Sequence, residues 1–387
     1  MSLPATVNGV PLRFFVLRGT LLLALLLGML ASVKLWLTAR AFPLLPVATW
    51  FPQLTRPWDI VVLVALLVAL VVGVRFYRQA AVFFLVGALF LYCGDQNRGQ
   101  PWFYLYCVLM LLTLLPEKPA VAACRLVVSA VYVWAAIQKF GPDYQRLVVP
   151  YMMQPVANWL PANLASVAKT FLMAGPAVEL FIGVGVWIPF LRRAAILTAV
   201  GVHGVALLIL GPLGHNYNLV VWPWNLTMVL LVVVLFPPVK LGENLRALRG
   251  SLRAAGVTAL VTLLPVLSYF GRWDSYFSFA LYSGNTATAD LFMVPTMVQR
   301  LPEPLRRFAH PLHEDVLKVN PGLRGLSVFD MQSWSQAELG VPPIPEPRAY
   351  RVIGRALARY AEQPTDLQLV IQPRGGAGQV LRASDLR

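Results

Sequence analysis

Charged residues are scarce in this chain of 387 residues: they make up 13% of it, against 58% hydrophobic residues, and the mean hydropathy is +0.66. A single soluble core of this length has no use for so much apolar material, which excludes an ordinary soluble protein. We therefore predict an all-α polytopic membrane bundle of about nine transmembrane helices, counted from apolar runs that are long enough, or nearly so, for a bilayer. These runs lie at about 14–38, 58–74, 79–93, 102–115, 121–139, 165–190, 194–212, 217–236 and 254–271.

Cysteine and histidine are also few. The three cysteines, Cys93, Cys107 and Cys124, lie in or beside predicted spans and form no CxxC pair, which argues against a thiol relay or a disulfide framework. Of the four histidines, His203 and His215 are too far apart in sequence for a local metal motif. We expect no metal.

Acidic residues are outnumbered by basic ones, 17 to 32, which gives a formal charge of +15. Nucleic-acid binding is one reading, but the basic residues sit in alternate short connections between spans, where they set membrane orientation. We therefore expect no nucleic-acid partner, a cytoplasmic N-terminus and an extracytoplasmic C-terminal region. The first run is long and lacks a small-residue cleavage site, so we expect a retained anchor. The basic connections hold Arg13 and Arg18, Arg75 and Arg78, Lys118 and Arg125, Arg192 and Arg193, and Lys240, Arg246, Arg249 and Arg253.

The composition changes near residue 272. We predict a transmembrane domain over 1–271 and a small extracytoplasmic α+β domain over 272–387, which is large enough to fold as a cap. Within the second domain, residues 276–285 have the pattern of a strand that runs into a turn, 348–360 that of a helix with one apolar side, and 367–373 that of a strand.

Polar residues within the apolar runs are the candidates for function, because an ionisable group is costly to bury in a membrane. Lys139 ends the fifth run, in "YVWAAIQKFGPDY", while Glu179 lies midway along the sixth and His203 near the middle of the seventh. Each has a structural alternative: a lysine that reaches the headgroups, a structural ion pair and an interhelical hydrogen bond. The outward turns add polar and aromatic residues, namely Asp95, Asn97, His215, Asn218 and Trp222, the last of which also suits an interfacial aromatic belt.

If the predicted topology holds, nearly all this polarity lies in the outer half of the bundle. A lysine held among apolar groups is desolvated, which favours a neutral amine that acts as a base. An apolar pocket with few polar groups suits an apolar ligand that enters from the lipid, such as a quinone.

Two segments resemble the vitamin K-dependent gamma-glutamyl carboxylases and the wider HTTM family of membrane proteins. "RLVVSAVYVWAAIQKFGPDY" (125–144) is similar to an aromatic-rich helix, here containing Trp134, that ends in a lysine and a short turn. "DQNRGQPWFYLYCVL" (95–109) is similar to a polar turn followed by a Tyr-Leu-Tyr helix, here containing Tyr104. The resemblance covers about residues 90–240 and also includes Glu179 and His203.

This resemblance implies an integral membrane carboxylase that uses vitamin K hydroquinone or menaquinol, with a protein or peptide substrate on the extracytoplasmic side. Lys139 matches the base that deprotonates the hydroquinone, and Gln138 stands where the family often has a second lysine. The implied catalytic residues are Lys139, His203 and Glu179, and the implied cofactor-binding residues are Asp95, Asn97, Tyr104, Trp134, His215, Asn218 and Trp222.

Two other readings remain open. One is a non-catalytic subunit that resembles DoxX-type quinone-associated proteins, holds a lipid or quinone, and docks a partner through its C-terminal region. The other is a small-solute transporter. A transporter predicts a polar path across both halves of the membrane and often internal repeats; the inner half offers little polarity, and no repeat is evident.

Overall fold

The computed structural model describes residues 6–7 and 10–387 and is mostly helical. Within this part of the chain, five helices are long and apolar enough to cross a membrane. They are α1 (Leu12–Ala31), α4 (Tyr77–Gly94), α6 (Glu117–Ile137), α10 (Arg192–Leu210), and α13 (Leu252–Leu263) continued by the 3-10 helix η3 (Leu264–Phe270). Shorter apolar helices lie among them: α3 (Trp58–Val72), α5 (Pro101–Leu112) and α11 (Val221–Leu235).

The span predicted over 165–190 is not a continuous helix. The segment forms two helices, α8 (Ala162–Met173) and α9 (Gly175–Gly185), bent by 50°. The bend falls at Gly175-Pro176, because proline lacks the backbone N–H that would continue a helix and restricts the residue before it. Gly175 is also crowded, since a Cβ there would lie 2.6 Å from the Tyr144 hydroxyl. Glu179 consequently lies in the first turns of a new helix rather than midway along a long one.

The segment 141–161, between the fifth and sixth apolar runs, is not a plain loop either. It holds the π-helix η2 (Tyr144–Val148) and the helix α7 (Val149–Trp159), which pairs with α8 as a helical hairpin. The remaining short elements of the N-terminal part are β1 (Thr6–Val7), β2 (Val10–Pro11), α2 (Val33–Trp36), η1 (Gln96–Arg98) and α12 (Leu241–Arg249).

Helix α6 is central in the bundle and packs against α5, α9, α12 and α13. It meets α9 at Gly183, where an added Cβ would lie 3.1 Å from the Ser129 carbonyl oxygen and 2.8 Å from Val133 Cγ2. The Ser129 hydroxyl donates a hydrogen bond of 2.7 Å to the Gly183 carbonyl. Small residues at such a crossing let two backbones meet directly. The crossing fixes α9 against α6 one helical turn from Glu179.

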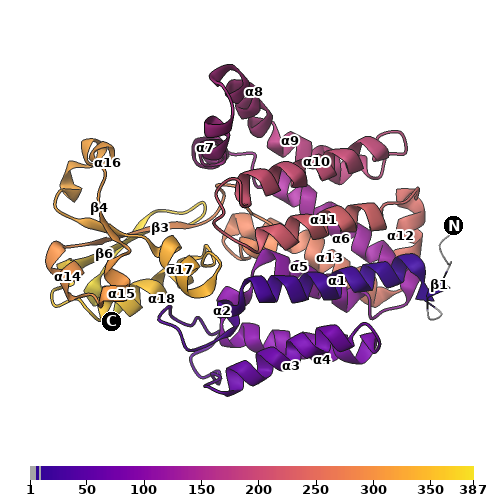
Figure 1. Ribbon diagram of the computed structural model, residues 1–387, viewed down its shortest axis with the longest axis horizontal. Helices are drawn as coiled ribbons and strands as arrows, with labels where there is room; N and C mark the ends of the chain where they lie inside the picture. Colours follow the sequence, from indigo (N-terminus) through magenta and orange to yellow (C-terminus); the bar gives the residue numbers. More distant parts are fainter. Residues whose placement is uncertain (1–5, 8–9) are drawn as a thin grey trace.

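In Figure 1, the starts of α1 and α10 and the helix α12 lie at the end of the bundle opposite the C-terminal part, and these segments contain Arg13, Arg192 and Arg246. Arg18 donates to the Thr113 carbonyl at 2.8 Å, and Arg125 donates to the Leu235 carbonyl at 2.5 Å. These contacts join the ends of helices that are distant in sequence. The basic connections identified in the sequence therefore lie together at one end.

The C-terminal part contains a five-stranded antiparallel sheet with strand order β4-β5-β3-β6-β7. Helix α18 and strand β6 confirm the helix expected at 348–360 and the strand expected at 367–373. The strands are β3 (Thr288–Met293), β4 (Ala309–Pro311), β5 (Ser327–Phe329), β6 (Leu367–Gln372) and β7 (Gln379–Arg382). The other elements are α14 (Pro295–Arg300), α15 (Glu303–Arg306), α16 (Glu314–Val319), η5 (Pro321–Leu323), α17 (Met331–Leu339), α18 (Pro347–Ala358), η6 (Pro364–Asp366) and α19 (Ala383–Leu386).

The strand expected at 276–285 is wrong. The segment starts with a 3-10 turn, η4 (Tyr276–Ser278), and Phe279 and Tyr282 have positive φ angles of 57° and 47°. Its side chains pack onto the bundle instead of pairing with the sheet: Phe277 lies against Tyr104, and Phe279 is 1% exposed. The alternation in its sequence therefore reflects burial against helices.

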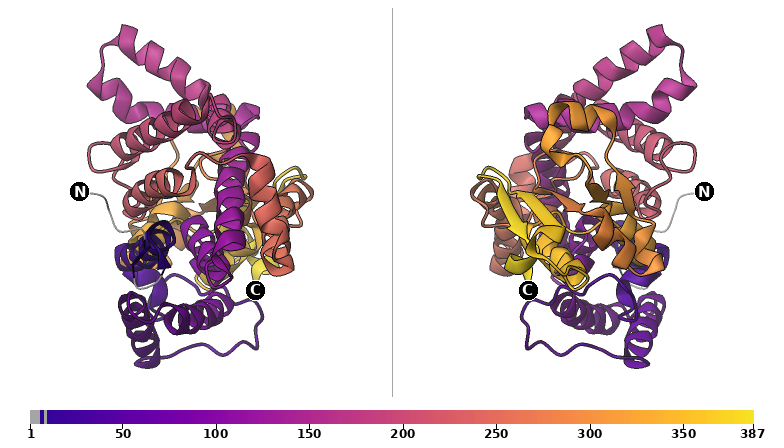
Figure 2. Two further views of the ribbon diagram at one scale, coloured as in Figure 1. Left: turned by 90° about the vertical axis from the view of Figure 1, so that its right-hand side faces the viewer. Right: turned by 90° about the vertical axis from the view of Figure 1, so that its left-hand side faces the viewer.

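Polar contacts tie the sheet domain to the end of the bundle. The Arg348 guanidinium contacts both carboxylate oxygens of Asp274, and its Nε donates to Gln96 Oε1 at 2.8 Å. Arg374 contacts Gln138, and Gln138 also accepts a hydrogen bond from Asn285 at 2.8 Å. The sheet domain thus lies over one end of the helices, as the views in Figure 2 show.

Candidate functional site

Lys139 lies just beyond the end of α6 and is 8% exposed. Its ammonium nitrogen is 2.9 and 2.8 Å from the two carboxylate oxygens of Glu179, and it also donates to the Ala135 carbonyl at 3.3 Å. The Lys139 side chain is therefore held inside the protein rather than directed to its surface. It forms an ion pair between α6 and α9, in which the side chains of Lys139 and Glu179 are 9% and 19% exposed.

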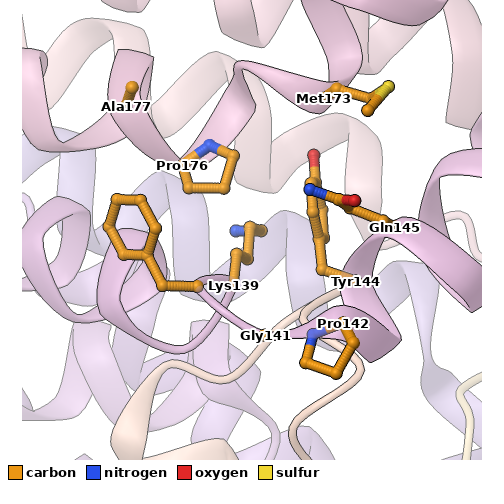
Figure 3. A pocket seen from close by; sticks show the side chains of 9 residues that line it. Lys139, Gly141, Pro142, Tyr144, Gln145, Met173, Pro176 and Ala177 are labelled. Atoms are coloured by element: carbon orange, nitrogen blue, oxygen red, sulfur yellow. The ribbon is translucent and has the colours of Figure 1, made fainter.

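A pocket of about 360 Å³ lies beside this lysine, at the Gly141-Pro142 turn. Figure 3 shows Lys139 near its centre, with Tyr144 to one side and Pro176 above. The Tyr144 hydroxyl donates to the Leu172 carbonyl at 2.7 Å, which joins the turn to the end of α8. The turn and the α8–α9 bend thus hold the lysine between two spaces, this pocket and a larger cavity.

A second polar group crosses three helices. The Tyr132 hydroxyl on α6 is 2.7 Å from His203 Nε2 on α10, and His203 Nδ1 is 2.7 Å from Asn225 Oδ1 on α11. The Asn225 amide nitrogen donates to the Val221 carbonyl, so its oxygen must accept from His203. This pattern assigns the imidazole proton to Nδ1 and makes Tyr132 the donor to Nε2. His203 therefore forms interhelical hydrogen bonds, which is the structural role that the sequence analysis offered as the alternative to a catalytic one.

Both polar groups line one cavity of about 1320 Å³. Helices α6, α7, α8, α9, α10 and α11 form most of its wall, and residues of the C-terminal part close one end, including Tyr276, Tyr282 and Ser333. Ligand pockets usually measure about 300–1,000 Å³, so this cavity has room for a large ligand. Most of the wall is apolar, and the polar groups are concentrated at Lys139–Glu179 and at the three-helix chain.

Four of the residues selected from the sequence line this cavity: Lys139, Glu179, His203 and Asn218. Asp95 and Asn97 do not. Asp95 is fully buried, pairs with Arg40 and accepts a hydrogen bond from the Asn97 backbone at 3.1 Å. These two residues order the turn between α4 and α5.

The other four selected residues also lie outside the cavity lining. Tyr104 packs against Phe277 with ring centroids 4.6 Å apart, and the Trp134 indole donates to the Thr262 carbonyl at 2.9 Å. Both therefore pack bundle elements together. His215 and Trp222 lie behind α7, one of the helices that line the cavity.

Two aromatic contacts support the wall from behind. His215 stacks on Tyr151 at 3.9 Å between ring centroids, and its Nε2 is 2.8 Å from the Tyr151 carbonyl oxygen. Trp222 packs in the apolar cluster beside Val156 of α7. These side chains position α7, whose Tyr151 and Val156 do line the cavity.

Three residues that line the cavity, Tyr132, Asn225 and Tyr282, are not among those selected from the sequence. Tyr132 lies two helical turns before Lys139, and residues at that spacing share a helix face, which was a usable signal. Asn225 is a polar residue within an apolar run, and that position was also a usable signal. Tyr282 gave no signal, because its place depends on how the C-terminal part covers the bundle.

Among the described residues, no three His, Cys, Asp or Glu side chains are grouped so that they could hold a metal ion. Comparison with models of known protein families, with curated proteins and with solved structures finds no match to this chain.

Proposed function

We propose that this membrane protein binds a (hydro)quinone-type ligand in the large cavity and activates its hydroxyl group at the Lys139–Glu179 pair. The observation that carries the proposal is the placement of a buried ion pair and a neutral Tyr132–His203–Asn225 chain in one mainly apolar cavity. An apolar ring with two oxygen atoms matches such walls, because few polar groups orient the ligand while apolar contacts supply affinity.

The pair provides a base as follows. In the proposed step, the ligand displaces water from the cavity and a proton passes from Lys139 to Glu179 across the 2.8 Å contact between them. The neutral amine of Lys139 then takes the proton of the ligand hydroxyl and becomes an ammonium group again. That ammonium stabilises the ligand oxyanion at the same position. His203, which carries its proton on Nδ1, holds Tyr132 in place as a hydrogen-bonding group of the wall.

We further propose, from the resemblance to the gamma-glutamyl carboxylases, that the reaction is a carboxylation. The bound hydroquinone and molecular oxygen would supply a strong base that removes a proton from a carbon acid, to which CO2 then adds. A peptide or protein substrate would bind at the end of the cavity that the C-terminal domain covers, where the lining includes the polar residues Thr288, Gln332 and Ser333.

We propose a cytoplasmic N-terminus, about nine spans and an extracytoplasmic sheet domain. The supporting observation is that the basic connections gather at the end of the bundle away from the sheet, as the contacts of Arg18 and Arg125 indicate. Basic residues are retained on the cytoplasmic side of a membrane. The cavity then lies in the outer half of the bilayer.

A second candidate function is a non-catalytic DoxX-like subunit that binds a quinone or lipid and docks a partner through residues 272–387. One observation favours it: Lys139 already contacts both carboxylate oxygens and a backbone carbonyl, which is the pattern of a structural link between α6 and α9. In this function the lysine has no chemical role.

The test supplies the purified protein with reduced vitamin K or menaquinol, oxygen, labelled bicarbonate and a short glutamate-containing peptide. We expect quinone epoxide and labelled peptide from the wild type and from Lys118→Ala, whose exposed lysine lies at the other end of α6, and neither product from Lys139→Ala. Products that persist in Lys139→Ala would refute the base. If the wild type binds the quinol but forms no product, the subunit reading replaces the enzyme.

A further inference from the structure

The cavity has an open side between the α7–α8 hairpin and α10. Helix α8 packs against α7 and the start of α9, and it contains no buried residue. Figure 2 shows the hairpin projecting from the rest of the bundle. Several apolar residues line the cavity and are nevertheless largely exposed, among them Phe171 on α8 at 72%, Leu147 in η2 at 57%, and Val205 and Leu208 on α10 at 48% each. A residue that both lines the cavity and is exposed at the protein surface marks a place where the cavity opens to that surface.

This side opening is apolar. Phe171, Val205 and Leu208 carry no hydrogen-bonding side chain, and α10 is one of the helices long and apolar enough to cross a membrane. An opening in the flank of such a helix faces lipid chains rather than water. The Lys139–Glu179 pair lies between α6 and α9, and the Tyr132–His203–Asn225 chain joins α6, α10 and α11. The space is therefore amphipathic, with its apolar end toward the bilayer.

We propose that the ligand is an amphiphile with one long hydrocarbon chain, which enters sideways from the bilayer between α8 and α10. Its polar head lies at Lys139 and Glu179, and its chain runs along α10 from Gly201 to Leu208, about 10 Å of helix. The position of the head rests on the proposed function. The side entry and the chain path rest on the opening itself.

Gly201 supplies a direct probe of the chain path. It lines the cavity, and a Cβ built on it meets no other atom within 4 Å. A larger side chain at this position therefore projects into free space and occupies the path without disturbing the packing. Gly204, one turn further along α10, also has nothing within 4 Å but is not part of the cavity lining. It is the matched control.

The experiment compares two probes with the full-length protein: a naphthoquinol with a long isoprenoid chain and the same ring without a chain. We expect Gly201→Leu to weaken binding of the chain-bearing probe at least tenfold and to change binding of the chainless ring by less than twofold. Gly204→Leu should leave both affinities unchanged, and Lys139→Ala should weaken both. Retained binding of the chainless ring also shows that the Gly201→Leu variant is folded.

A second measurement places the chain directly. A photoreactive group at the end of the isoprenoid chain should label peptides from α8 and α10. The inference is overturned if the label falls only in the C-terminal domain, or if Gly201→Leu affects both probes equally or neither. If any one of these results is obtained while the chainless ring still binds to the wild type and binds more weakly to Lys139→Ala, the proposed function stands and the side entry fails. If the wild type binds neither probe, both proposals fail.

Discussion

Replacing glycine by alanine should lower thermal stability at Gly183, where α6 and α9 cross, and should not lower it at Gly204 on α10. Gly183→Ala places a methyl group 3.1 Å from the Ser129 carbonyl oxygen and 2.8 Å from Val133 Cγ2. The valine side chain can rotate away, but the carbonyl belongs to the backbone of α6, so the two helices must separate by a few tenths of an ångström. Overpacking of this kind costs about 1–3 kcal/mol. The same shift stretches the hydrogen bond from Ser129 to the Gly183 carbonyl.

The control is Gly204→Ala on α10, where the new methyl group meets nothing within 4 Å. Alanine at an open helix position stabilises by about 0.5–1 kcal/mol relative to glycine. Thermal unfolding of both variants in the same detergent should therefore show a lower midpoint than the wild type for Gly183→Ala and an equal or higher one for Gly204→Ala. Equal shifts in the two variants would mean that the helices do not meet at Gly183.

Further predictions concern the polar groups. Lys139→Met and Glu179→Gln should each destabilise the protein, by up to about 3 kcal/mol because the pair is not fully buried, and the double variant by less than their sum; additive losses would deny the pairing. Tyr132→Phe leaves His203 Nε2 without its donor and should cost about 1–3 kcal/mol in thermal unfolding, whereas an unchanged midpoint would contradict the three-helix chain. In the C-terminal domain, burial raises the pKa of Glu346 above its ordinary value of 4.5, so its contribution to stability is full below that value and is lost as pH rises through the raised pKa. The midpoint difference between Glu346→Gln and wild type should therefore shift in favour of the variant from pH 4 to pH 7, and a difference independent of pH would refute this.

The location of several helices was predictable because a membrane-spanning helix needs a long apolar run, and such runs are visible in the sequence. The run at 121–139 corresponds to α6, and the run at 194–212 to α10. Lys139, Glu179 and His203 were also identifiable, since polar groups within apolar runs are rare. Helix α18 showed its periodicity plainly, with Ile353 and Leu357 buried on one side.

The pairing of these residues was not predictable. Lys139 and Glu179 are 40 positions apart, and only the crossing of α6 with α9 brings them together. The bend at Gly175-Pro176 was readable as local chemistry, but hydropathy averaged over the window hid it. The segment 276–285 was misassigned because burial against helices produces the same alternation of apolar residues as a strand does.

The contact between Gln138 and Arg374 has a consequence for how the protein is made. The spans emerge first from the ribosome, and domains generally fold in that order. The cavity, however, is closed by Tyr276 and Tyr282, and the residue next to Lys139 is held by Arg374, 236 positions further along the chain. The bundle therefore enters the membrane with an unfinished cavity, and the site takes its final form only after the sheet domain has been synthesised and has folded.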